Sequence, residues 1–135
     1  MLRRDFVVLG VSALSLGGCA GVRYVAPRAS PGRLVIALAD LGDDGQAFVQ
    51  TPDMQRPVYL RRLASGEIVA VLASCTHQGC QPEPVADRLA CPCHGSEFSF
   101  EGLVLQGPAE RPLTRYDVTE EGGDVVVWLA GRGAA

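Results

Sequence analysis

The stretch from residue 75 to residue 96 reads CTHQGC (75–80), a ten-residue spacer (81–90) and CPCHGS (91–96). These two short clusters contain both histidines of the chain and four of its five cysteines. Each cluster supplies one histidine and two cysteines. Together they can offer two thiolates and two imidazoles to a metal centre and still leave two cysteines free to pair.

The bulk composition describes a small folded domain. The chain has 135 residues, enough for one domain with one core. Apolar residues make up 47% of it and the formal net charge is −3, which argues against both intrinsic disorder and a nucleic-acid partner. The twelve basic residues are all arginine and are scattered along the sequence, so they form no basic stripe.

Residues 1–18 are expected to be a signal peptide rather than part of the fold. Arg3 and Arg4 precede an apolar run over residues 6–16, and a small-residue segment leads to Cys19. This pattern resembles a bacterial lipoprotein signal, in which the cysteine carries the lipid, and the paired arginines resemble a Tat export signal. We therefore expect an exported protein on the periplasmic face of a bacterial membrane, lipid-anchored through Cys19.

A plain secretory peptide and an uncleaved anchor helix are the alternatives for this N-terminal segment. The apolar run is well short of the ~20 residues that span a bilayer, which disfavours the helix. Glycine and proline with little apolar periodicity indicate that residues 19–33 are the lipid attachment site and a linker.

The expected folded domain covers residues 34–131. Short apolar segments separated by turn signals such as 43–45, 64–66 and 121–124 predict antiparallel strands, and no segment has a convincing helical period. The pattern predicts an all-β sandwich or small barrel with the two clusters on loops. The strands are expected at residues 34–38, 47–50, 58–63, 68–73, 113–118 and 125–129.

Three kinds of site are compatible with the clusters. Two disulfides suit an exported domain but leave His77 and His94 without a role. A zinc site with two thiolates and two imidazoles is chemically reasonable, although the spacing Cys-x-His is tighter than the usual arms of such sites. An iron–sulfur cluster with mixed ligands is the third possibility.

The two clusters closely resemble the two boxes of the Rieske [2Fe–2S] family. The resemblance continues through Ser96-Glu97-Phe98, Gly102, residues 106–109 and residues 111–113. The thirteen residues between His77 and Cys91 are slightly fewer than is usual in the family, which shortens the intervening hairpin without touching a ligand position.

The resemblance implies a Rieske-type antiparallel β-sandwich with a small cluster-binding subdomain made of two loops. It implies one [2Fe–2S] cluster per chain, with Cys75 and Cys91 on one iron and His77 and His94 on the other. It also implies a disulfide between the two remaining cysteines. The expected pair is Cys80 and Cys93.

Four neighbouring residues are expected to tune the cluster. Ser96 matches a serine whose hydroxyl donates to a bridging sulfide in the family. Phe98 stands where high-potential members have a tyrosine, and it cannot donate, so the resemblance implies an intermediate potential. Gly107 and Pro108 resemble the proline-bearing loop that covers the cluster.

The expected function is one-electron transfer to a redox partner such as a cytochrome or an oxidoreductase large subunit, with quinol as a candidate donor. With both histidines used, no histidines are left for the mononuclear iron site of a self-contained oxygenase. The alternatives are a Rieske subunit of a quinol-oxidising cytochrome bc-type complex, the small subunit of a periplasmic oxidoreductase such as arsenite oxidase, and a zinc-stabilised structural domain.

Overall fold

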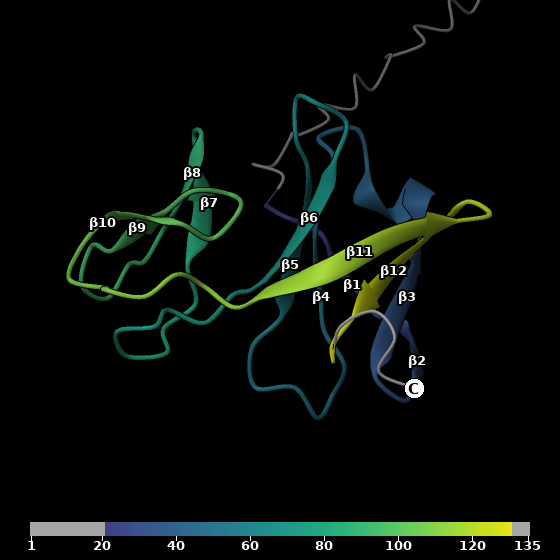
Figure 1. The fold of residues 1–135 in the computed structure, drawn as a ribbon, viewed down its shortest axis with the longest axis horizontal. Helices are drawn as coiled ribbons and strands as arrows, with labels where there is room; N and C mark the ends of the chain where they lie inside the picture. The colour runs from purple at the N-terminus through teal and green to yellow at the C-terminus, as the bar shows by residue number, and fades with distance from the viewer. Residues whose placement is uncertain (1–20, 131–135) are drawn as a thin grey trace, which may run out of the picture.

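The computed structural model describes residues 21–130, which form twelve strands and one 3-10 helix (Figure 1). The signal segment and Cys19 lie outside the described residues. Within residues 21–130, no helix is long and apolar enough to cross a membrane. The elements are β1 Tyr24–Val25, β2 Arg28–Ser30, β3 Arg33–Ala37, η1 Leu38–Leu41, β4 Gln46–Val49, β5 Val58–Arg62, β6 Ile68–Leu72, β7 Glu83–Val85, β8 Arg88–Ala90, β9 Glu97–Phe98, β10 Val104–Gln106, β11 Arg115–Glu121 and β12 Asp124–Trp128.

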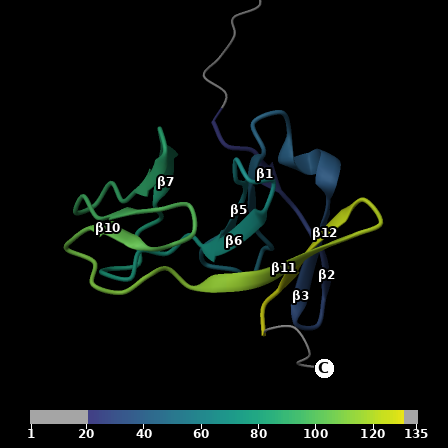
Figure 2. The ribbon, with the colours of Figure 1, turned by 45° about the horizontal axis from the view of Figure 1, so that its top comes forward.

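The main sheet has the strand order β1-β4-β5-β6-β11-β12-β3-β2. Strand β11 joins its two halves, because Arg115 and Tyr116 pair with β6 whereas residues 117–121 pair with β12. Gly122 and Gly123, both at positive φ, make the two-residue turn between β11 and β12. A smaller sheet, β10-β9-β8-β7, stands beside the main one (Figures 1 and 2).

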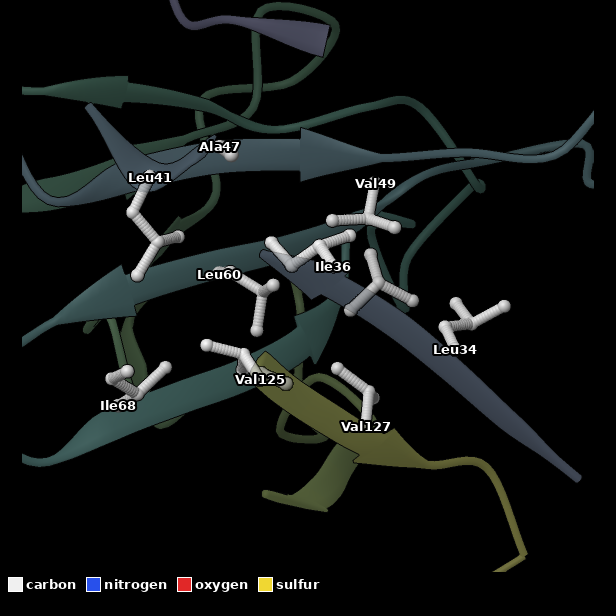
Figure 3. Packing of buried hydrophobic residues seen from close by; sticks show 11 residues of the cluster. Leu34, Ile36, Leu41, Ala47, Val49, Leu60, Ile68, Val125 and Val127 are labelled. Atoms are coloured by element: carbon white, nitrogen blue, oxygen red, sulfur yellow. The ribbon is translucent and has the colours of Figure 1, made fainter. Parts of the chain in front are cut away.

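The first core lies between the two halves of the main sheet. Figure 3 shows side chains of β3 and β12 meeting those of β4, β5 and β6. The alternation of Leu34 and Ile36 on β3 directs both into this core, as the period of a half-buried strand requires. This packing confirms the all-β fold that the sequence predicts.

The second core lies on the opposite face of β4, β5 and β6, towards the small sheet. Phe48, Tyr59 and Val71 alternate with neighbours that face the first core, so these three strands are buried on both faces. Leu89 and Phe98 cover this face from the small sheet. Burying a side chain of this size contributes about 1.5–3 kcal/mol. The second core therefore holds the small sheet and the loops at 75–80 and 91–96 against the main sheet.

The segment expected to be a linker differs from the prediction. Strand β1 pairs in parallel with β4, and β2 pairs antiparallel with β3, so chain from residue 24 onward belongs to the sheet. The ring of Tyr24 lies 5.1 Å from that of Phe48, measured between centroids. The physical reason is that two- and three-residue strands leave no readable periodicity but still satisfy edge hydrogen bonds.

Candidate metal centre

The loops at 75–80 and 91–96 share one hydrogen-bond pattern. In each, the amide of the first cysteine donates to the carbonyl five residues on, and the glycine amide donates to the carbonyl of that cysteine. These N···O distances are 2.7 and 2.7 Å in the first loop and 2.8 and 3.1 Å in the second. Gly79 and Gly95 have φ of 75° and 77°, a conformation that glycine adopts without strain. The loops are thus equivalent in backbone structure.

The loops separate their thiols from their imidazoles. Cys75 and Cys91 are free, only 4% and 3% exposed, and belong to the second core. His77 and His94 are exposed, and their ring centroids lie 5.1 Å apart with the ring planes at 81°. The same two loops therefore carry two buried sulfur donors and two exposed imidazoles.

A disulfide joins the loops. Cys80 and Cys93 are bonded at an S–S distance of 2.05 Å, with their Cα atoms 6.4 Å apart. This finding confirms the expected pairing, and neither residue can act as a thiolate ligand while the disulfide is intact. Cys75 and Cys91 remain as the free cysteines of the described chain.

The residues expected to tune the centre lie around the second loop. Ser96 is fully buried, and its Oγ accepts a hydrogen bond from the Ala109 amide at 3.0 Å. Its own hydroxyl hydrogen is therefore left to donate elsewhere. Gly107 and Pro108 are exposed and directly precede Ala109. Phe98 is fully buried in the second core, with which Cys91 also packs.

Two arginines hydrogen-bond to the loop at 75–80, and the sequence had not indicated either contact. Arg56 Nε donates to the carbonyl of Gly79 at 2.7 Å, and Arg111 Nη2 donates to that of Thr76 at 3.4 Å. Thr76 Oγ1 in turn donates to the Arg111 carbonyl at 2.7 Å. These partners are 23 and 35 residues apart in sequence, so no local signal could have identified them.

A surface hollow of about 500 Å³ lies beside the exposed imidazole of the first loop. It is lined by Thr76, His77, Pro108, Glu110 and Arg111. The loop at 75–80 and the segment that follows Pro108 thus form its two walls. Glu110 and Arg111 supply one negative and one positive charge to its lining.

A family model described as "Rieske [2Fe-2S] domain" matches residues 33–117. The chain belongs to the Rieske [2Fe–2S] family. Its cofactor is accordingly a [2Fe–2S] cluster. The donor set fits this group, because two buried thiols and two exposed imidazoles provide the mixed sulfur and nitrogen ligands of a Rieske centre.

Curated relatives of this Rieske chain include iron–sulfur subunits of cytochrome b6-f complexes. The one from Chlorobaculum tepidum is 33% identical over 115 residues, covering 81% of this chain and 62% of the relative. The chloroplastic one from Volvox carteri is 34% identical over 140 residues, covering 87% and 68%. This chain thus spans about three fifths of the Chlorobaculum subunit.

Solved structures show the same fold. The cyanobacterial plasma membrane Rieske protein PetC3 from Synechocystis PCC 6803 matches with a TM-score of 0.59 and 39% identity, covering 67% of this chain and 93% of that one. A complex of oxygenase and ferredoxin in carbazole 1,9a-dioxygenase matches with a TM-score of 0.62 and 23% identity, over 76% and 98%. The second likeness concerns the fold alone.

Proposed function

We propose that this chain is a one-electron carrier whose cluster is bound by Cys75 and Cys91 at one iron and by His77 and His94 at the other. The observation that carries the proposal is the pair of imidazoles, 5.1 Å apart between ring centroids, on the same two loops that hold two buried free thiols. When bound, the cluster supplies one-electron redox chemistry at a potential higher than that of an all-cysteine cluster.

The residues around the cluster site would shield it from water and connect it to a redox partner. The second core shields the thiol side from water, since Cys75 and Cys91 are packed among apolar side chains. The exposed imidazoles offer the short path by which an electron reaches a docked partner. Their free ring nitrogens can also hydrogen-bond a partner's group or exchange a proton with it.

We further propose that the protein is exported and held at the periplasmic face of a bacterial membrane by a lipid on Cys19. The signal-like residues 1–18 support this location, and so does the Cys80–Cys93 disulfide, because such bonds persist in oxidising compartments. Strand β1 begins at Tyr24, which leaves only four residues between Cys19 and the sheet. At up to ~3.5 Å per residue, such a tether keeps the domain close to the membrane.

A quinol-oxidising complex of the cytochrome bc type is the second candidate setting. The identity of 33–34% to cytochrome b6-f iron–sulfur subunits favours it, and the hollow beside His77 has room for part of a partner or a quinol head group. Affinity purification of the tagged, lipid-bearing chain from membranes tests it. Recovery of a cytochrome b would support this setting, whereas recovery of a molybdenum-containing large subunit would support an oxidoreductase instead.

Electron paramagnetic resonance of the dithionite-reduced protein tests the ligand assignment. We expect a rhombic [2Fe–2S] signal that is lost in Cys75→Ser and in His94→Ala. The Cys80→Ser/Cys93→Ser double variant should still bind iron, because it lacks only the disulfide. A colourless wild-type protein that contains zinc and gives no signal would overturn the electron-carrier function.

A further inference from the structure

Three sulfur atoms converge at the junction of the two loops. The Sγ atoms of Cys80, Cys91 and Cys93 all lie within 4.8 Å of one another. Cys91 is buried, Cys80 is partly buried and Cys93 is exposed, so the group opens to solvent on one side. In the part of the chain that the structure describes, Cys75 is not a member of this mutually close set.

With the Cys80–Cys93 bond open, three sulfurs placed this close together can surround a single thiophilic ion. At a zinc–sulfur distance of about 2.3 Å, three thiolates around one ion lie about 4 Å apart. Small side-chain rotations bring the three sulfurs to that spacing once the disulfide between two of them is open. Zinc accepts three cysteines with a fourth, neutral ligand, which the open side can supply as water.

We propose that Cys80, Cys91 and Cys93 form a zinc-type site when the chain is reduced and lacks its cluster. Formation of the Cys80–Cys93 disulfide then abolishes the site, because it leaves only one of the three thiolates. The bond therefore selects the metal as well as bracing the loops: it prevents a single thiophilic ion from capturing Cys91. The competition between this ion and the cluster for Cys91 rests on the proposed function, in which Cys91 is an iron ligand. The three-sulfur site itself does not depend on that assignment.

Opening the disulfide requires a reductant, and a water-soluble phosphine supplies it. The S–S bond breaks, phosphorus is oxidised and takes the oxygen atom of one water molecule, and the two protons of that water end on the two thiols. Ion binding then displaces the thiol protons to solvent, since the thiolate is the ligand. A phosphine is preferable to a dithiol because it adds no competing sulfur ligands.

Cobalt(II) titration of the cluster-free full chain tests the site without any redox activity as readout. After phosphine treatment, we expect one Co²⁺ per chain with intense thiolate-to-cobalt absorption, and little such absorption in the unreduced chain. Cys80→Ser and Cys93→Ser should each weaken binding by at least about tenfold and lower the intensity.

Cys75→Ser is the matched control, because it removes a cysteine of the same centre that lies outside the set. It should bind Co²⁺ like the wild type. The proposal is overturned if Cys75→Ser abolishes binding while Cys80→Ser and Cys93→Ser retain it. That result would place the ion among the residues proposed to hold iron.

The cluster-loaded protein provides a second measurement. It tests the proposed three-sulfur site if circular dichroism shows that the reduced, cluster-free chain has lost its strand content. Phosphine and Zn²⁺ together should bleach the visible absorption of the cluster several-fold faster than either alone. Equal rates with and without Zn²⁺ in the phosphine-treated protein would overturn the proposal. Absence of the rhombic signal at the start would instead count against the electron-carrier function.

Discussion

The buried hydroxyl of Ser96 accepts a hydrogen bond from the backbone amide of Ala109 at 3.0 Å. This bond joins the second cysteine loop to the proline-bearing loop, thirteen residues further along the chain. Because the hydroxyl accepts here, its hydrogen remains free to donate. We propose that it donates to the cluster, so that one side chain would link the proline-bearing loop to the electronic environment of the centre.

Ser96→Ala should lower both the midpoint potential and the stability. Loss of a donor to the negatively charged cluster predicts a fall of about 65–130 mV, from about 1.5–3 kcal/mol for a charge-assisted bond. The orphaned Ala109 amide costs a further ~1–3 kcal/mol of unfolding free energy. Voltammetry and denaturant unfolding measure the two effects.

Ser99→Ala is the matched control for this prediction. Ser99 Oγ also accepts a backbone amide, that of Leu103 at 3.1 Å, but in the β9–β10 hairpin. We expect its midpoint potential to equal that of the wild type. A shift of the same size in both variants would show that Ser96 acts only through general stability.

Phe98→Tyr should raise the midpoint potential. The added hydroxyl can donate to a cysteine sulfur of the cluster and stabilise the reduced state by about 1 kcal/mol, which is about 40 mV for one electron. Phe100→Tyr serves as control, because that ring is half-buried and stacks with Tyr59 and Arg61. A potential that stays constant or falls in Phe98→Tyr would refute the assigned role of this position.

Arg56→Gln should lower the midpoint potential by about 10–40 mV, because an exposed cation near the first loop contributes only about 0.2–1 kcal/mol. Arg56→Lys keeps the charge but not the planar group that donates to the Gly79 carbonyl, so it should recover most of the loss. Arg33→Gln, on β3 beside Trp128, should have no effect. If the Arg56→Gln shift is the same at high salt, charge is not its cause.

Glu83→Gln should change how stability depends on pH. Burial raises the pKa of Glu83 above its ordinary value of 4.5, although a hydrogen bond from Gln81 partly opposes this. The folded state therefore holds this proton more tightly, and the unfolding free energy falls as pH rises through that region. In urea unfolding of the disulfide-bonded chain, the unfolding free energy of the variant relative to that of the wild type should increase as the pH is raised from below 4.5 to neutrality.

Asp87→Asn, at the turn of the same β7–β8 hairpin, should behave in the opposite way. The hydrogen bond from Arg88 lowers the pKa of Asp87, so its contribution is present at neutral pH and is lost as pH falls through the folded pKa. This variant should be less stable than wild type at neutral pH and equal to it in acid. Parallel pH profiles for the two variants would contradict both assignments.

Much of the fold could be predicted from local patterns in the sequence. Alternation at Leu34 and Ile36 and the run Val125–Val127 predict strands that the structure contains, because burial of one face imposes a period on the sequence. The glycines at 122–123 mark the hairpin between the last two strands, since its turn needs positive φ. Strands β1 and β2 were missed because edge strands this short carry no such period.

The sequence by itself placed two cysteines and one histidine in each of two short loops, because ligand chemistry requires specific residue types, and the resemblance of these loops to the Rieske boxes indicated the family and the cofactor. Only the tertiary structure decided which face each donor takes: it buried the thiols of Cys75 and Cys91 in the second core and left His77 and His94 exposed. It alone placed Arg56 at Gly79 and the Cys80–Cys93 disulfide within reach of Cys91. The Arg56–Gly79 contact and the disulfide join residues 23 and 13 positions apart, so both depend on how the chain folds rather than on local sequence.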